Sequence, residues 1–286
     1  MITRQLGQTR QRVTAIGLGA MPLTMSGRPD SDTARQVIAC FINGGGNFID
    51  TANVYTEYAH GVGENEALVA ATVSELGVAG KVVVATKGGL RRTRTGWDVD
   101  ASPAWLNQSC DASLRALGMD CIMLYQLHAP DPDIDIRESV GAMKILQEAG
   151  KIRDIGLCNV GIEHIEAARS VVPVVTVQNA LHPRRKKSLH NGVVDYCREA
   201  DISFIAHSPV GGYHRYQQLH TDDELHGIAR RHDTTPACIS LAWLLRLGAL
   251  PIPGARRCAS VEASFSSMSL QLDDKDMAAI NTLQDW

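Results

Sequence analysis

The stretch FIDTANVYTEYAHGVGENEALVAATV, residues 48–73, holds a short apolar run, a polar loop and an amphipathic run in that order. The apolar pair Phe48 and Ile49 predicts a strand over residues 47–49, and residues 64–76 repeat apolar side chains at the spacing of a helix. The carboxylate of Asp50 follows the predicted strand directly, and the phenol of Tyr55 lies in the loop. A strand that leads through ionisable groups into a helix is typical of α/β enzymes, in which strand ends carry the chemistry.

The same strand-and-helix unit recurs along the whole chain. Predicted strands cover residues 15–19, 47–49, 82–85, 121–126, 152–157, 174–177, 202–206 and 250–252. Predicted helices cover residues 32–43, 64–76, 102–117, 137–149, 161–170, 188–200, 222–232 with 236–246, and the chain from 261 onward. Eight such units in 286 residues, with no Pro/Gly/Ser-rich linker between them, predict one α/β domain, a (β/α)8 barrel spanning residues 1–286.

The first residues and one glycine pair bear on the choice between two α/β folds. Residues 3–13, TRQLGQTRQRV, alternate around a glycine and predict a β-hairpin that closes the bottom of the barrel. A doubly wound dinucleotide-binding sheet is the alternative. Against it, GLGAMP at residues 17–22 contains only two glycines of the dinucleotide fingerprint, and Pro22 stands where the next helix should begin.

The composition describes a globular chain with little net charge. With 44% hydrophobic and 21% charged residues and a formal charge of -3, it gives no electrostatic footprint for nucleic acid. We interpret the basic run at residues 184–187 as a solvated loop. The absence of a long apolar segment and of a signal-like start predicts no membrane partner and a cytoplasmic protein. Seven cysteines without a C-x-x-C pair indicate reduced thiols, with no metal site expected.

Polar residues stand at the ends of the predicted strands. In a barrel all strands run parallel, so their carboxyl ends meet on one rim, where barrel enzymes keep their active sites. Seven of the eight ends carry such residues: Asp50 and Tyr55, Lys87, His128, Asn159, Gln178, His207 and Ser208, and Gly254, Arg256 and Arg257. Each alone has an ordinary explanation, such as a helix cap or a solvated strand end. Their coincidence on one rim predicts an active site.

Seven segments in the same order resemble the aldo-keto reductase superfamily: NFIDTANVY, VVVATKGG, LYQLHAPD, GKIRDIGLCN, VVTVQNALH, IAHSPVGG and IPGARR. The resemblance covers nearly the whole chain. It implies a barrel that binds NADP(H) without a dinucleotide-binding fold and reduces a small aldehyde or ketone. Within the family, PLTMSGRPD and SPVGGYH are similar to segments of bacterial pyridoxal reductases, so pyridoxal is the first substrate candidate.

The resemblance also implies roles for individual residues. The family's catalytic tetrad is matched by Asp50, Tyr55, Lys87 and His128. Cofactor contacts are implied at Gly19, Met21, Asp50, Asn159, Gln178, His207, Ser208, Pro209, Val210, Gly254, Arg256 and Arg257. The two arginines match the place where the family binds the adenosine 2′-phosphate, so a preference for NADP(H) over NAD(H) is expected. The loops that carry Trp97, Tyr213 and Tyr216 are expected to wall the substrate pocket.

Carbonyl reduction gives each member of the tetrad a task. Hydride delivered to a carbonyl carbon leaves negative charge on the oxygen, which a positioned acid must meet. Tyr55 is the expected donor, and the ammonium of Lys87 is expected to lower the pKa of its phenol. Asp50 would keep Lys87 charged, and His128 would orient the carbonyl. Tyr58, in the same loop, is the competing donor.

Three features depart from the family pattern. Cys158 stands where a serine usually precedes the asparagine that binds the carboxamide of the cofactor. His207 stands where a tyrosine often stacks on the nicotinamide. Ala263 and Ser264 replace the Glu-Asn pair expected to hold adenine, which weakens the expected adenine contact.

The residues leave two other functions open. A Schiff-base aldolase would use Lys87 as its nucleophile, with Asp50 and Tyr55 as partners in proton transfer. A nicotinamide-sensing regulatory subunit is the third possibility, because the family also resembles potassium-channel β-subunits.

Overall fold

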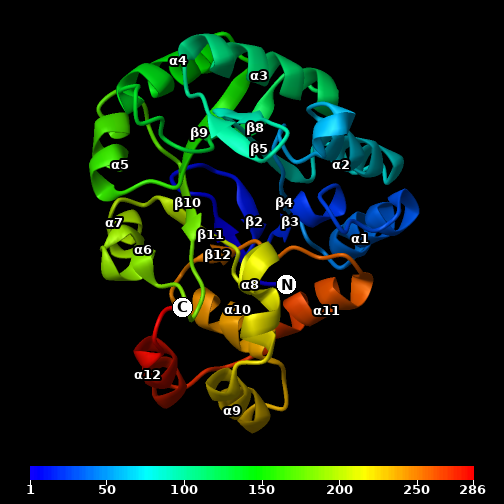
Figure 1. Ribbon diagram of the computed structural model, residues 1–286, viewed down its shortest axis with the longest axis vertical. Helices are drawn as coiled ribbons and strands as arrows, with labels where there is room; N and C mark the ends of the chain where they lie inside the picture. The colour runs from blue at the N-terminus through cyan, green and yellow to red at the C-terminus, as the bar shows by residue number, and fades with distance from the viewer.

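The computed structural model describes residues 1–286, except for the side chains of Tyr213 and His214. Eight parallel strands form one sheet in the order β12-β11-β10-β9-β8-β5-β4-β3. They are β3 (Leu18–Gly19), β4 (Phe48–Asp50), β5 (Val83–Gly88), β8 (Ile122–Leu127), β9 (Ile152–Cys158), β10 (Thr176–Ala180), β11 (Ser203–His207) and β12 (Leu250–Pro251). Helices surround these strands as a ring (Figure 1).

The two outer strands of the sheet meet and close the barrel. Gly19 forms a parallel bridge with Gly254, and its backbone N–H donates to the carbonyl oxygen of Pro253 at 3.0 Å. A Cβ atom on Gly19 would lie 2.8 Å from the carbonyl oxygen of Ile252, and one on Gly254 would lie 2.5 Å from Cγ of Pro22. These glycines therefore permit close backbone approach at the seam. The predicted (β/α)8 barrel is confirmed, and the doubly wound alternative is wrong.

The helices follow the strands in alternation. The α-helices are α1 (Ser31–Asn43), α2 (Glu64–Glu75), α3 (Pro103–Leu117), α4 (Ile136–Glu148), α5 (Ile162–Arg169), α6 (Lys187–His190), α7 (Val193–Glu199), α8 (Gly212–His220), α9 (Asp223–Arg231), α10 (Pro236–Arg246), α11 (Cys258–Ser266) and α12 (Asp274–Thr282). Short 3-10 turns are η1 (Met21–Leu23), η2 (Tyr58–His60) and η3 (Ser267–Ser269). The Ser102 hydroxyl accepts the backbone N–H of Trp105 where α3 begins. Within the described residues, no helix is both long and apolar enough to cross a membrane.

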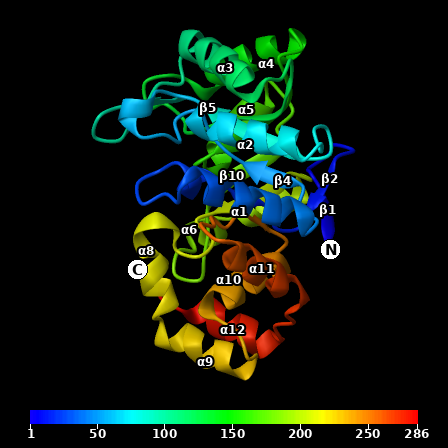
Figure 2. The same ribbon diagram turned by 90° about the vertical axis from the view of Figure 1, so that its right-hand side faces the viewer.

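A hairpin covers the end of the barrel that lies away from the polar rim. Strand β1 (Thr3–Gln5) pairs antiparallel with β2 (Arg12–Thr14), as predicted. Leu6 and Val13 are buried in one cluster with strand residues such as Leu124 and Ile205. Figure 2 shows the hairpin on one side of the barrel and α8, which follows the carboxyl end of β11, on the opposite side. The hairpin therefore closes the amino-terminal end of the strands.

Several boundaries differ from the prediction. Strands β4, β5 and β11 extend further than expected, so Asp50, Lys87 and His207 lie in the last residues of strands. The predicted helix over residues 188–200 is interrupted at Gly192, whose φ of 79° separates α6 from α7. Helix α8 and the hairpin of β6 (Leu90–Arg92) with β7 (Trp97–Val99) were not predicted, because these segments are short and mostly polar, without a clear apolar period.

The basic run at residues 184–187 is not a solvated loop throughout. Arg184 is buried and forms an ion pair with Asp222 at 2.6 Å. Lys186 is buried too, and its Nζ donates to the carbonyl oxygens of Asn281, at 2.8 Å, and Leu283. These two cations satisfy the carboxylate that caps α9 and the carbonyls at the end of α12, so the prediction is wrong for both. The other two residues of the run are exposed.

Candidate active site

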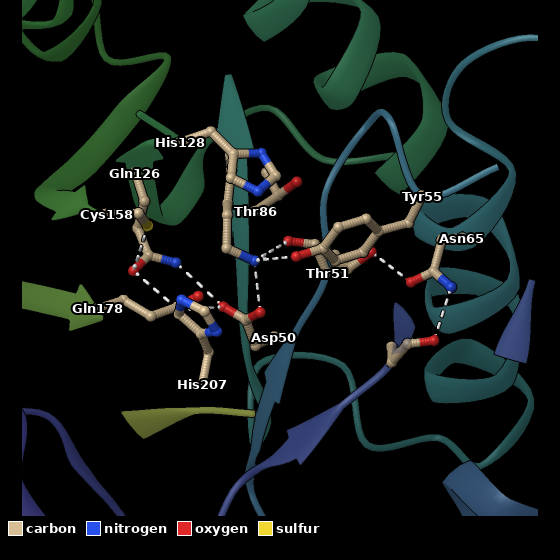
Figure 3. A network of polar contacts seen from close by, with 12 residues as sticks. Asp50, Thr51, Tyr55, Asn65, Thr86, Gln126, His128, Cys158, Gln178 and His207 are labelled. Atoms are coloured by element: carbon tan, nitrogen blue, oxygen red, sulfur yellow. Dashed lines mark hydrogen bonds and ion pairs between the residues drawn. The ribbon is translucent and has the colours of Figure 1, made fainter. Parts of the chain in front are cut away.

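Lys87 lies near the carboxyl end of β5 with its side chain fully buried. Its Nζ donates to the Asp50 carboxylate, to the carbonyl oxygen of Thr51 at 2.9 Å and to the Tyr55 hydroxyl at 3.1 Å (Figure 3). Strands β4 and β5 are neighbours in which Asp50 stands opposite Ala85, so the carboxylate and the ammonium reach the same rim. The structure thus brings three of the four predicted tetrad residues into direct contact.

The partners of Lys87 determine its charge. Burial alone would lower the pKa of the ammonium. The nearby Asp50 carboxylate and Tyr55 phenol act in the opposite direction and raise the pKa above its ordinary value. Lys87 is therefore a cation at neutral pH.

Two glutamine amides hold Asp50 from the side opposite Tyr55 (Figure 3). Nε2 of Gln178 and Nε2 of Gln126 donate to Asp50 Oδ2 at 2.7 Å and 3.1 Å. Oε1 of Gln126 accepts from the Cys158 thiol at 3.7 Å, and burial raises the pKa of that thiol. Gln126 was missed by the sequence analysis, although a polar residue within a buried strand is a signal that could have found it.

Tyr55 is a protonated phenol in this environment. Burial raises the pKa of Tyr55, and the lowering by the Lys87 ammonium does not offset it. The expectation that Lys87 brings the pKa of the phenol below its ordinary value is therefore wrong for the protein alone, since desolvation is the larger effect. The competing tyrosine, Tyr58, lies in η2 with 56% of its surface exposed. Of these two phenols, the one that contacts Lys87 is Tyr55.

His128 follows β8 directly, and its ring faces Tyr55. The ring centroids of His128 and Tyr55 are 5.7 Å apart in an edge-to-face arrangement. The side chain is 9% exposed, and its Nδ1 is buried without a hydrogen-bond partner in the described part of the chain. Burial and the charge of Lys87 hold the pKa of His128 well below its usual range. His128 is thus a neutral imidazole at the fourth corner of the site.

A chain of hydrogen bonds links the ends of β8, β9 and β11. Asn159 donates from Nδ2 to the carbonyl oxygen of His128 at 2.9 Å, which fixes its Oδ1 toward Nε2 of His207 at 3.2 Å. Because a carboxamide oxygen only accepts, Nε2 of His207 carries the proton, and its Nδ1 accepts from the Ser208 hydroxyl at 3.1 Å. Burial lowers the pKa of His207 to about 3. The predicted residues Asn159, His207 and Ser208 therefore lie together.

The remaining predicted cofactor residues lie on the loops after β3, β11 and β12. They are Met21 at the start of η1, the buried Pro209 and Val210, and the exposed Gly254, Arg256 and Arg257. Nη2 of Arg256 donates to the carbonyl oxygen of Ser26 at 3.2 Å, and Nε of Arg257 donates to the Ser260 hydroxyl at 3.3 Å. Arg257 immediately precedes α11. Among the described residues, no cluster of His, Cys, Asp and Glu suits a metal ion.

The hairpin β6–β7 is hydrogen bonded to the loop that carries Tyr55. Nε1 of Trp97 donates to the carbonyl oxygen of Val54 at 3.2 Å, and Nε of Arg92 donates to that of Thr56 at 2.8 Å. The Trp97 side chain remains 41% exposed. On the other predicted wall, Tyr216 stacks on His220 at 5.8 Å, whereas the Tyr213 side chain lies outside the described residues. Trp97 is thus anchored to the loop that carries Tyr55 and remains partly exposed.

Comparison with known proteins gives a match over nearly the whole chain. The family model described as "Aldo/keto reductase family" matches residues 15–285. A curated aldo-keto reductase of Schizosaccharomyces pombe, yakc [NADP(+)], is 31% identical over 97% of this chain and 90% of its own length. A probable aldo-keto reductase of Glycine max is 29% identical over 96% of this chain and 87% of its own length.

Solved structures share the fold at lower sequence identity. The glycerol dehydrogenase of Gluconobacter oxydans superposes with a TM-score of 0.84 at 24% identity, covering 98% of this chain and 94% of that one. An aldo-keto reductase of Bacillus halodurans in its holo form superposes with a TM-score of 0.83 at 24% identity, covering 100% and 97% of the two chains. These likenesses show a common barrel.

Proposed function

The chain belongs to the aldo/keto reductase family, and we propose that it reduces an aldehyde or ketone to an alcohol with NADP(H), using Tyr55 as the proton donor. The observation that carries this proposal is the contact of Lys87 Nζ with both the Asp50 carboxylate and the Tyr55 hydroxyl. A cation held against a phenol stabilises the phenolate that forms when the phenol gives up its proton.

The residues present fit a nicotinamide cofactor with a 2′-phosphate. Asn159 and Ser208 adopt left-handed backbone conformations, with φ of 59° and 53°, and such strain gathers at ligand sites. They would hold the nicotinamide end, beside His207. Arg256 and Arg257 are exposed guanidinium groups that would hold the 2′-phosphate. When bound, NADPH supplies the hydride for the carbonyl carbon.

The protein's own residues divide the proton transfer among them. Tyr55 stays protonated at neutral pH and can donate to the oxygen on which charge develops. Lys87, held by Asp50 and by Thr51, stabilises the resulting phenolate. The neutral imidazole of His128, which lies edge to face with the Tyr55 ring, orients the substrate carbonyl.

A Schiff-base aldolase is less compatible with the geometry. A nucleophilic lysine needs a neutral amine, which enzymes obtain by lowering its pKa in an apolar or cationic environment. Here the Asp50 carboxylate raises the pKa of Lys87, and three acceptors occupy its ammonium. Lys87 is therefore better suited to stabilise a phenolate than to attack a carbonyl.

A screen of carbonyl compounds tests the proposed function. We expect NADPH absorbance to fall when one or more small aldehydes or ketones are added. Pyridoxal is the first candidate substrate. Trp97 is expected to contact the substrate. The alcohol product should be identified at a ratio of one molecule per NADPH consumed. A lysine adduct that borohydride traps at Lys87, formed without any NADPH consumption, would establish the aldolase instead.

A further inference from the structure

Two thiols from different helices meet beside the loop that carries Arg256 and Arg257. Cys258, the first residue of α11, donates from Sγ to the carbonyl oxygen of Gln36 on α1 at 3.6 Å. Cys40 lies one helical turn beyond Gln36 on the same face of α1, so its side chain lies beside that of Cys258. Both cysteines are partly exposed. An oxidant can therefore reach a pair of thiols that are already neighbours.

The packing of α1 on α11 keeps this pair together. The rings of Phe41 and Phe265 stack with centroids 5.3 Å apart, one residue after Cys40 and near the far end of α11. A Cβ atom on Gly44 would lie 2.6 Å from the Phe265 ring, so the two helices approach closely. This packing keeps α1 and α11 close together, and two cysteines can form a disulfide only where their helices approach closely.

We propose that Cys40 and Cys258 form a disulfide when a hydroperoxide oxidises them, and that this bond weakens the binding of NADP(H). The second half of the proposal rests on the proposed function, because it takes Arg256 and Arg257 as the residues that hold the 2′-phosphate.

The reaction balances with peroxide as the oxidant. The Cys258 thiol releases its proton, and the thiolate attacks one peroxide oxygen, so that the O–O bond breaks and a sulfenic acid forms. With hydrogen peroxide the leaving group is hydroxide, which takes up the proton that the thiol released and becomes water. The Cys40 sulfur then attacks the sulfenic sulfur, the S–O bond breaks, and a second water leaves as the S–S bond forms. Two thiols lose two electrons in total, and the peroxide gains them.

The order of attack follows from the state of Cys40. Its contact with Cys258, burial and the charges of Cys258 and Glu262 raise the pKa of Cys40 to about 11. Cys40 is therefore a protonated thiol at neutral pH and a poor first nucleophile. This assigns the first attack to Cys258 and the closing step to Cys40.

Closing the bond should move the start of α11. A disulfide holds its sulfurs about 2 Å apart, closer than two sulfur atoms without a bond between them can lie. We therefore expect the first turn of α11 to draw toward α1, and Arg257, the residue before Cys258, to move with it. Arg256 is tied to Ser26 across the loop, so the two guanidinium groups change their relative positions. By linkage, bound NADPH should in turn slow the oxidation.

Peptide mapping and cofactor titration test the proposal together. Wild type, Cys40→Ser, Cys258→Ser and the control Cys121→Ser are treated with hydrogen peroxide, and disulfide-linked peptides are identified by mass spectrometry. Cys121 is a suitable control because it is also partly exposed. We expect a Cys40–Cys258 peptide in wild type and in Cys121→Ser, and its absence from the other two variants. Fluorescence titration should show NADPH affinity about 5-fold weaker or more in the oxidised protein, restored by dithiothreitol.

The outcomes separate the bond from its effect. Oxidation that stops at a sulfenic or sulfinic acid, or links other cysteines, would overturn the disulfide. A mapped disulfide with unchanged NADPH affinity would overturn the coupling. Reduced wild type that binds no NADPH would overturn the proposed function and the coupling with it, whereas the mapped peptide would still decide whether the disulfide forms.

Discussion

Two lysines of this chain are almost completely buried, and they differ in the groups that their ammonium ions contact. Lys87, at the end of β5, faces the Asp50 carboxylate, and its pKa is raised. Lys186, before α6, faces the carbonyl oxygens of Ile280, Asn281 and Leu283, and burial lowers its pKa. Both side chains are fully hydrogen bonded, but only Lys87 has an adjacent phenol whose charge it can stabilise.

The partners of a buried lysine distinguish a catalytic cation from a structural one. A buried lysine that donates only to backbone carbonyls closes a helix end, and its charge has no reacting partner. A buried lysine between a carboxylate and an ionisable donor can respond to a proton transfer. Substitution should therefore affect activity at Lys87 and stability at Lys186.

The largest expected effect is the loss of activity in Lys87→Met. Without the ammonium, the phenolate of Tyr55 loses its stabilising charge, and the reduction rate should fall by about 10³-fold. Single-turnover reduction by bound NADPH measures this step. Cofactor titration and circular dichroism of the same variant show whether the fold and the cofactor site persist. If Lys87→Met binds NADPH and reduces substrate at more than a tenth of the wild-type rate, the role assigned to Lys87 is wrong.

The next effect, at Tyr55, separates the proton donor from its neighbour. Tyr55→Phe removes only the hydroxyl group, so reduction should slow by at least about 10²-fold while NADPH binding stays close to that of wild type. Tyr58→Phe is the matched control, because Tyr58 lies in the same loop and is exposed. The same single-turnover assay applies to both. An inactive Tyr58→Phe beside an active Tyr55→Phe would exchange their roles.

The sequence predicted the site near Lys87 better than the surroundings of Lys186, for a physical reason. Strands that end in polar residues show both features within a few residues, so Asp50, Lys87 and His128 could be placed on one rim before any contact was known. The acceptors of Lys186 lie about a hundred residues away in sequence, and no local pattern records such a partner. From the sequence alone, a basic run is therefore predicted to be solvated, and only the folded structure shows that the carbonyl oxygens of α12 accept its hydrogen bonds.

The same reason explains what was missed inside the site. The Tyr55 pKa depends on the balance between burial and the charge of Lys87, and only burial in the fold decides which is larger. Gln126 was read as the last residue of an apolar strand, whereas its amide holds Asp50. Patterns along the chain identified the residue types, but not the strength of their interactions.

A third cationic region, formed by Arg256 and Arg257, differs from both lysines because it is exposed at the surface. Arg256 and Arg257 should give a preference for NADPH over NADH of about 10- to 100-fold, because guanidinium–phosphate hydrogen bonds are charge-assisted. Fluorescence titration of both cofactors with wild type, Arg256→Ala and Arg257→Ala at fixed ionic strength measures it. At least one substitution should remove most of the preference. Equal affinities of the wild type for NADPH and NADH would show that the predicted preference does not exist.

Lys186→Met should leave the catalytic rate near that of wild type but lower the stability of the fold. The substitution removes the donor for the carbonyls at the end of α12, and a buried acceptor without a partner costs about 1 to 3 kcal/mol. Lys187→Met is the matched control, since the neighbouring Lys187 is exposed. Urea unfolding of the two variants measures the difference between their free energies of unfolding. Equal stability of the two would mean that water replaces the Lys186 ammonium at no cost.

The smallest effect is the pH dependence of the two lysines, which should have opposite signs. Folding lowers the pKa of Lys186, so the unfolded chain binds the lysine proton more readily than the folded protein does. The stability of wild type relative to Lys186→Met should therefore rise as the pH approaches about 10.4, the ordinary pKa of lysine. The pKa of Lys87 is raised, so its contribution should be complete below that pH and decline above it. Urea unfolding of wild type and both variants between about pH 8 and about pH 11 measures the two trends, and each variant cancels the titration of groups that do not interact with the substituted lysine. Trends of the same sign would show that the Asp50 carboxylate does not distinguish the two sites, and the contrast between a catalytic and a structural lysine would then have to rest on Tyr55 alone.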